Sequence, residues 1–260
     1  MKEHNAEVAL DVGASVFGAA LGATIGGPPG SIVGAIVAPV IADFGKRMLS
    51  PKEVSRVERL QSLVADSVAK SVANNAALRV DLTSSEDIQR QISQLFEGFL
   101  LKARGMYEEK KLPLLANLCA RSFFTNTPLE NVLRSLKLTE DLSYRQLIIL
   151  SLYNPFRIDP SVNTSGLSQR SLRSVQNEIG DEYSLGVVLD LWDLVQQGIL
   201  IQTSDDLVTP VAVIAPGDII PGRLELGYPG RLLHNGLGLS SITGSEQKPI
   251  IAVLSRSLLP

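Results

Sequence analysis

The pattern of hydrophobic and polar positions divides the chain into three parts. Residues 12–42 contain no ionisable side chain, residues 50–137 repeat apolar positions at steps of three and four, and residues 138–260 mix helical with strand-like patterns. Steps of three and four place apolar side chains on one face of an α-helix, whereas β-branched runs favour strands. The pattern predicts a mainly α protein with an apolar glycine-zipper hairpin over residues 1–49, a helical bundle and a winged-helix-like C-terminal domain with a small β-hairpin.

Glycine recurs at every fourth position of the uncharged part, at Gly18, Gly22, Gly26, Gly30 and Gly34. Glycine destabilises a helix in water by roughly 0.5–1 kcal/mol relative to alanine, so the repeat needs a compensating reason. At this spacing the glycines would form a groove without side chains, where another backbone can approach closely. Such spacing is typical of helix packing in membranes. The five glycines are therefore candidate residues for membrane insertion and self-association.

Two prolines, Pro28 and Pro29, interrupt the uncharged part between glycines. Because proline breaks or kinks a helix, we predict a hinge here between helices over residues 12–25 and 31–42. Each helix is shorter than the roughly 20 apolar residues that a membrane span needs. Three arrangements remain open: a hairpin that dips into one leaflet, a single kinked span, or two helices packed against the body of a soluble protein.

The middle part contains repeated signals for the start of a helix. Ser50-Pro51-Lys52-Glu53 is a capping box with proline at the first helical position. An apolar stripe follows it, formed by Val54, Val57, Leu60, Val64, Val68 and Val72. We predict helices over residues 50–76, 83–107 and 112–124, and a fourth that starts at residue 127. The short polar joints between these helices predict an all-α bundle.

The last part predicts a helix over residues 138–154 and two shorter helices over residues 167–179 and 182–197. Strands over residues 199–201 and 207–214 would then form a β-hairpin. Three helices followed by a β-hairpin are typical of a winged helix-turn-helix domain. A closing helix near residues 231–236 and an apolar strand or tail over residues 248–255 complete the prediction.

The helix over residues 182–197 is the candidate recognition helix of that domain, and its charges are acidic. It carries Glu182, Asp190 and Asp193 but neither arginine nor lysine, and carboxylates are repelled by the DNA backbone. Arg170 and Arg173, on the preceding helix, offer only a thin basic patch for nucleic acid contact. We therefore expect a protein partner rather than DNA.

Composition and motifs do not indicate an enzyme. The formal net charge is −3 and the chain has two histidines and one cysteine, so no metal cluster or catalytic triad can be assigned. The glycine-rich part has no lysine that could hold nucleotide phosphates. We expect no catalytic residue, no cofactor and no metal. The single Cys119 is expected to be a buried residue in a reducing cytosol.

Four segments resemble the Abi-alpha abortive-infection family of bacteria. They are EEKKLPLLANLCARSFF (108–124), LTEDLSYRQLIILSLY (138–153), GILIQ (198–202) and LELGYPGRLLHNGL (224–237). In that family they correspond to two acidic-then-apolar helices, a wing and a closing helix that contains glycine. The resemblance implies phage defence through growth arrest or death of the infected cell, without an established enzyme activity.

These observations lead to one hypothesis and two alternatives. The hypothesis is a non-enzymatic anti-phage effector that is cytoplasmic, associates conditionally with the inner membrane and inserts its glycine-zipper segment after a trigger or a protein partner releases it. Copies of the chain would then associate through the glycine faces. The alternatives are a soluble helical adaptor whose apolar part is only core, and a winged-helix regulator.

Overall fold

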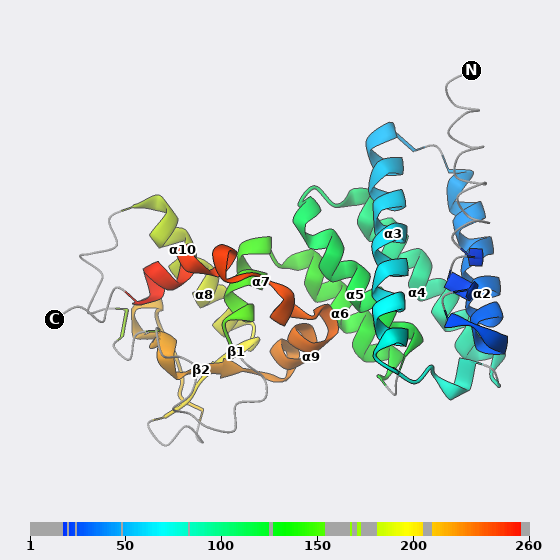
Figure 1. Cartoon of the computed structure of the whole chain (residues 1–260). Helices are drawn as coiled ribbons and strands as arrows, with labels where there is room; N and C mark the ends of the chain where they lie inside the picture. The colour runs from blue at the N-terminus through cyan, green and yellow to red at the C-terminus, as the bar shows by residue number, and fades with distance from the viewer. Residues whose placement is uncertain are drawn as a thin grey trace. The chain divides into compact units, whose positions relative to one another are not determined.

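The computed structural model describes residues 18, 19, 21–23, 25–47, 49–82, 84–124, 127–153, 167, 171, 172, 181–204 and 210–255. It is mainly helical, with one two-stranded antiparallel sheet in the described part (Figure 1). This confirms the predicted mainly α class and the presence of a small antiparallel sheet. The chain divides into two compact units, Met1–Asp141 and Leu142–Pro260.

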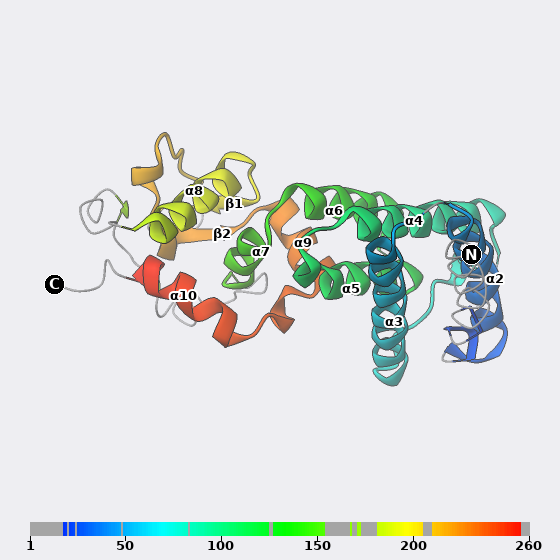
Figure 2. The ribbon, with the colours of Figure 1, turned by 90° about the horizontal axis from the view of Figure 1, so that it is seen from above.

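The first unit is a group of helices arranged around α4. Its elements are α2 (Gly27–Gly45), α3 (Pro51–Ala73), η1 (Val80–Leu82), α4 (Glu86–Gly105), η2 (Glu109–Lys111), α5 (Leu112–Phe123) and α6 (Leu129–Asp141). Helix α4 contacts α2, α3, α5 and α6, and Figure 2 shows it running past both α3 and α2. The bundle character predicted for the middle of the chain is confirmed.

Side-chain caps explain where the helices of this unit begin. The Ser50 side chain accepts from the Glu53 backbone N–H, and the Glu53 carboxylate accepts from the Ser50 N–H, which forms the predicted capping box of α3. Ser85 caps α4 in the same way through the Ile88 N–H. Helix α4 ends at Gly105, two residues earlier than predicted, because Met106 adopts an extended backbone.

The predicted apolar stripe forms the contact between α3 and α5. Val57, Leu60, Val64 and Val68 are completely buried, and α3 packs against α5 and α4. Burial of each such side chain contributes roughly 1.5–3 kcal/mol, which outweighs the weak intrinsic helix propensity of valine. The three- and four-residue spacing therefore determined which face of α3 is buried.

The second unit contains shorter helices around the sheet. Its elements are α7 (Tyr144–Ser151), α8 (Glu182–Gln196), β1 (Leu200–Gln202), η4 (Pro216–Asp218), η5 (Pro221–Arg223), β2 (Leu224–Leu226), α9 (Tyr228–Leu237), η6 (Leu239–Ser241) and α10 (Gly244–Ser255). The predicted closing helix lies within α9, and the predicted helix over residues 182–197 is α8. The helix predicted over residues 167–179 falls almost entirely outside the described residues.

The single helix predicted over residues 138–154 is wrong. Helix α6 continues to Asp141, and α7 starts at Tyr144 after a second capping box. The Ser143 side chain accepts from the Gln146 N–H at 3.1 Å, and the Gln146 side chain accepts from the Ser143 N–H at 2.7 Å. This cap satisfies backbone donors that a continuous helix would have used internally.

The predicted β-hairpin also needs correction, because β1 pairs with β2 and not with a strand over residues 207–214. Leu200, Ile201 and Gln202 lie opposite Leu226, Glu225 and Leu224. Of the predicted strand, Pro210 forms only an isolated bridge with Thr203, and residues 205–209 lie outside the described residues. The buried Gln202 side chain holds the long connection by accepting from the Ile220 N–H at 2.7 Å and donating to the Asp218 carbonyl at 3.3 Å.

The last apolar segment is helical, which corrects the predicted strand or tail over residues 248–255. Ile250, Val253 and Leu254 of α10 are buried at helical spacing. Pro249 lies inside the helix and removes one backbone donor. A short apolar run cannot be assigned to helix or strand by its periodicity alone, and here the packing of α10 on α7 and α8 favours the helix.

Candidate functional site

The predicted glycines face one another across two helical segments. We call the described residues between 18 and 45 the glycine segment. A Cβ atom at Gly30 would lie 2.2 Å from the Gly22 carbonyl oxygen, and one at Gly34 would lie 2.7 Å from the Gly18 carbonyl oxygen. Real Cβ atoms do not approach backbone oxygen so closely, so only glycine fits at these two positions. The backbones pack directly against each other, as the spacing of four predicted.

The chain reverses at Gly26, and the two glycine pairs are arranged symmetrically about it. Gly26 has a φ of 73° and is the N-cap of α2, a backbone conformation that glycine adopts without steric cost. Pro28 and Pro29, the predicted hinge, belong to the first turn of α2. Proline is tolerated there because the first helical N–H groups have no intrahelical partner. The break in the helix therefore comes at Gly26, two residues before Pro28 and three before Pro29.

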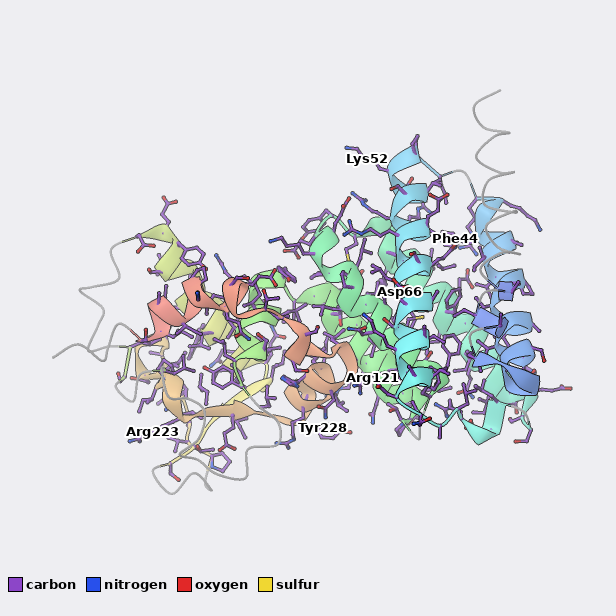
Figure 3. All side chains as sticks on the ribbon, in the orientation of Figure 1. Phe44, Lys52, Asp66, Arg121, Arg223 and Tyr228 are labelled. Carbon is purple, nitrogen blue, oxygen red and sulfur yellow. The ribbon has the colours of Figure 1, made fainter. Side chains whose placement is uncertain are left out.

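A second face of α2 packs against the body of the first unit. Val33, Val37, Ile41 and Phe44 are 0–1% exposed and recur at steps of four and three. Helix α2 contacts α4 and η1, and Figure 3 shows Phe44 on the side of α2 that faces the other helices. Ser31, Ala35 and Pro39 lie on its solvent-exposed side. The glycine segment is thus closed on itself by one face and attached to the bundle by another.

An ion pair connects the C-terminal end of the glycine segment to α4. Arg47 forms a hydrogen-bonded ion pair with Glu97 and a second, 3.5 Å contact with Asp43. Its guanidinium also lies 5.1 Å from the centre of the Phe44 ring, within the range of a cation–π interaction. Sequence reasoning missed this pair, because Arg47 and Glu97 are far apart in the chain and no local spacing relates them.

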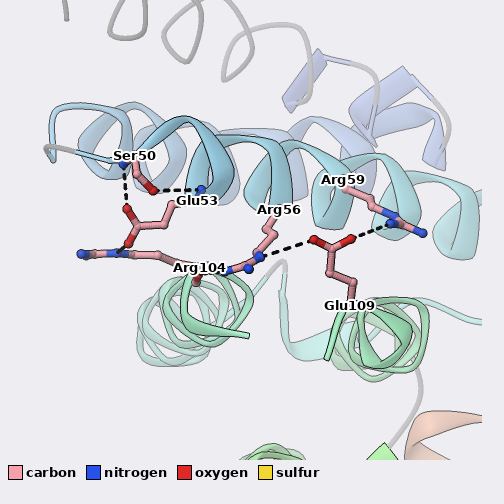
Figure 4. A network of polar contacts seen from close by, with 6 residues as sticks. All are labelled: Ser50, Glu53, Arg56, Arg59, Arg104 and Glu109. Atoms are coloured by element: carbon pink, nitrogen blue, oxygen red, sulfur yellow. Dashed lines mark hydrogen bonds and ion pairs between the residues drawn. The ribbon is translucent and has the colours of Figure 1, made fainter. Parts of the chain in front are cut away.

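A separate polar network joins α3 to α4 and η2 (Figure 4). Glu53 accepts from Arg104 Nε at 2.7 Å, while Glu109 lies 3.7 Å from Arg56 Nε and 3.3 Å from Arg59 Nη1. The hydrogen bond from Arg104, followed by those from Ser50, lowers the pKa of Glu53 from 4.5 to about 2. This network joins helices of the bundle and includes no residue of the glycine segment.

Three further side chains with titratable or aromatic groups lie in the described part of the chain, at Cys119, His234 and Trp192. Arg170 and Arg173 lie outside the described residues. Cys119 is completely buried, as expected, and burial raises the pKa of its thiol, which keeps the thiol protonated and unreactive. His234 is a buried residue of α9 whose pKa is lowered by burial. Trp192 is half-buried on α8.

Two further observations concern what this arrangement can bind. In the part of the chain that the structure describes, no helix is both long and apolar enough to cross a membrane. Among the same residues, no group of three or more His, Cys, Asp or Glu side chains could hold a metal ion. The candidate site is the glycine segment, where the two backbones come into close contact.

Comparison with known proteins found no matching family model and no similar curated protein or solved structure.

Proposed function

We propose that the protein is a membrane-active effector whose glycine segment is held closed on the helical body and is released on activation. The observation that carries this proposal is the backbone-to-backbone contact of Gly18 with Gly34 and of Gly22 with Gly30. These glycines lie in a stretch of sequence, residues 12–42, that has no ionisable side chain. Charged side chains are costly inside a bilayer, and small residues at spacing four allow helices to associate there. A segment with both properties is suited to enter lipid after release.

The closed arrangement supports a conditional rather than a permanent membrane role. One apolar face of α2 is buried on the bundle, and the glycine faces are occupied by each other. Release would expose the apolar face and free the glycines for a second copy of the chain. In this proposal, copies of the chain associate through their glycine faces only after the glycine segment has left the bundle. Neither the release nor the association needs a catalytic step.

The proposed release can be tested at the Arg47–Glu97 pair. Arg47→Glu and Glu97→Arg each place like charges together at the end of α2, so we expect both variants to leak dye from vesicles of phosphatidylethanolamine and phosphatidylglycerol. The double variant, with the charges exchanged, restores attraction and should leak as little as the native chain. Leakage measured by dequenching of an encapsulated fluorophore separates these outcomes.

Two controls keep this test decisive. Phe44→Ala removes a buried ring from the same contact, and deletions of this kind cost about 3–5 kcal/mol, so it opens the segment without changing its charge. If neither the charge reversals nor Phe44→Ala releases dye, the membrane proposal is refuted. Circular dichroism must show that the helical content of each variant is retained.

The biological role that we propose is abortive infection. The four segments that resemble the Abi-alpha family support it, together with the conditional design of the glycine segment. Cells that carry the gene should lose membrane potential and stop growing after phage infection, and should yield fewer phages than cells without it. Normal phage yield and an unchanged potential-sensitive dye signal during infection would contradict this role.

A second candidate function is a helical adaptor with a winged-helix-like second unit. Three large apolar side chains of α8, Tyr183, Leu185 and Leu189, are 43–51% exposed, which favours a protein partner. On the same helix, Asp190 accepts from Arg145 and Asp193 accepts from Gln146. The carboxylates would repel DNA phosphates, and Arg145 is already paired, so these groups do not support DNA binding. Fractionation of cells before and after infection distinguishes the candidates, because an adaptor stays in the soluble fraction throughout.

A further inference from the structure

A pocket in the first unit lies between the C-terminal end of α4, the η2 joint, α5 and α6. Its volume is about 210 Å³, which exceeds the roughly 150 Å³ of an engineered apolar cavity that binds benzene. Leu101, Met106, Leu115 and Leu136 provide apolar walls. None of its lining residues belongs to the glycine segment. The pocket is large enough for a small organic molecule with an apolar body.

Two ion pairs, Lys111–Glu108 and Lys102–Glu140, provide the charges of this pocket. In both pairs the lysine side chain is less exposed than the glutamate side chain, with 6% against 27% for the first pair and 34% against 50% for the second. The carboxylates are therefore the better hydrated members. The two lysines, and Lys111 above all, are therefore the less hydrated charges that line the pocket.

Lys111 still has hydrogen-bonding capacity for a ligand. Its Nζ lies 3.2 Å from Glu108 Oε2, and among the described residues Glu108 supplies the one carboxylate within ion-pair distance. An ammonium group has three donors, and a buried charge is costly unless it is paired and hydrogen-bonded. An anionic group in the pocket would accept from the remaining donors, while its apolar body would contact the leucines and Met106.

We propose that this pocket binds a small organic monoanion, a carboxylate on an apolar body about the size of a phenyl ring, with Lys111 as the anion-binding residue. Lys102, which also lines the pocket, adds a second positive charge. A cationic ligand would instead lie beside the buried Lys111 and the half-buried Lys102 and be repelled. This assignment is independent of the membrane activity proposed for the glycine segment.

Titration calorimetry with 3-phenylpropanoate tests the site on the full chain, with 3-phenylpropanamide and 3-phenylpropylamine as neutral and cationic controls. We expect the carboxylate to bind at least about tenfold more tightly than the amide, because the amide keeps a carbonyl acceptor but lacks the negative charge that pairs with the Lys111 ammonium. The amine should not bind. Equal binding of carboxylate and amide, or no binding of the carboxylate, would overturn the proposal.

Three variants locate the binding. Lys111→Met keeps the aliphatic stem and should weaken carboxylate binding at least about tenfold, to the affinity of the amide. Lys110→Met is the matched control, since Lys110 is exposed and does not line the pocket. Gly105 lines the pocket, and a Cβ there would meet no atom within 4 Å, so a larger side chain can be added without a clash. The ring of Gly105→Phe should then occupy the space of the ligand and abolish binding of both the carboxylate and the amide. Unchanged affinity in Lys111→Met and Gly105→Phe refutes the site. If Lys111→Met does not fold, as judged by circular dichroism, Gly105→Phe and the carboxylate–amide comparison still decide.

Discussion

Helices α2 and α3 pack against the same helix, α4, but differ in the other contacts that hold them. Helix α3 fills its contacts with Val57, Leu60, Val64 and Val68 and is fixed further by the Glu53–Arg104 and Arg56–Glu109 interactions. Helix α2 has one apolar face on the bundle, a glycine face on its own chain and the Arg47–Glu97 pair at its end. The comparison teaches that α3 is held by apolar contacts and polar links to its neighbours, whereas α2 combines an apolar face on the bundle with a glycine face closed on its own chain.

The largest effect is expected from a cavity on the α3 side. Leu60→Ala removes a completely buried side chain, and such deletions lower the free energy of unfolding by about 2–5 kcal/mol. Urea denaturation should show this loss. Leu133→Ala in α6, where the leucine is 52% exposed, should change stability by no more than about 0.5 kcal/mol. Equal losses in the two variants would contradict the assignment of α3 to the core.

A smaller and local effect is expected from the glycine contact. Gly30→Ala places a Cβ against the Gly22 carbonyl oxygen and should cost about 1–3 kcal/mol by overpacking. Because the added Cβ disturbs the glycine contact and not the α3 interface, the backbone amides of α2 should exchange faster with deuterium while those of α3 remain protected. This difference between the two helices is the direct test of the comparison.

A glycine elsewhere in the unit is the matched control for that variant. A Cβ at Gly98 in α4 would meet only Leu136 Cδ2, at an ordinary 3.6 Å. Gly98→Ala should therefore stabilise the unit by about 0.5–1 kcal/mol, through reduced backbone entropy of the unfolded chain. Faster α2 exchange in Gly98→Ala as well would show that the exchange does not report the glycine contact.

The smallest effect is expected from acid. The pKa of Glu53 is lowered from 4.5 to about 2, so its contribution is fully present above about pH 4.5 and is lost as the pH falls towards 2. Glu53→Gln keeps a capping acceptor but has no charge. The melting temperature of the native chain should exceed that of the variant at pH 7, and the difference should shrink below pH 4.5. A difference independent of pH would assign the effect to packing instead.

Local signals predicted the first unit better than the second. The capping box at Ser50 and the apolar stripe of α3 each depend on residues within one helix, so the spacing of residues in the sequence is enough to identify them. In the second unit, the partner of β1 lies beyond a long connection, and the buried Gln202 side chain determines its course. A run such as residues 248–255 is ambiguous until its neighbours are known, which is why a strand was expected where α10 forms.

The candidate site shows the same division. Glycine spacing identified Gly18, Gly22, Gly30 and Gly34 as contact residues, whereas Arg47–Glu97 and the pocket around Lys111 had no sequence signal. Charged residues are common on helix surfaces, and only the folded chain brings Lys111, Lys102 and the leucines of three helices around one space.

The sequence by itself determined that residues 12–42 lack charge and that a close helix contact forms through glycines at every fourth position, because helical periodicity and the absence of a Cβ are local properties. Only the tertiary structure decided what fills that contact. The glycines before Gly26 meet those after it, and Phe44 and its apolar neighbours attach the segment to α4. The choice depends on which surfaces meet when the chain folds, and no spacing along the chain encodes it.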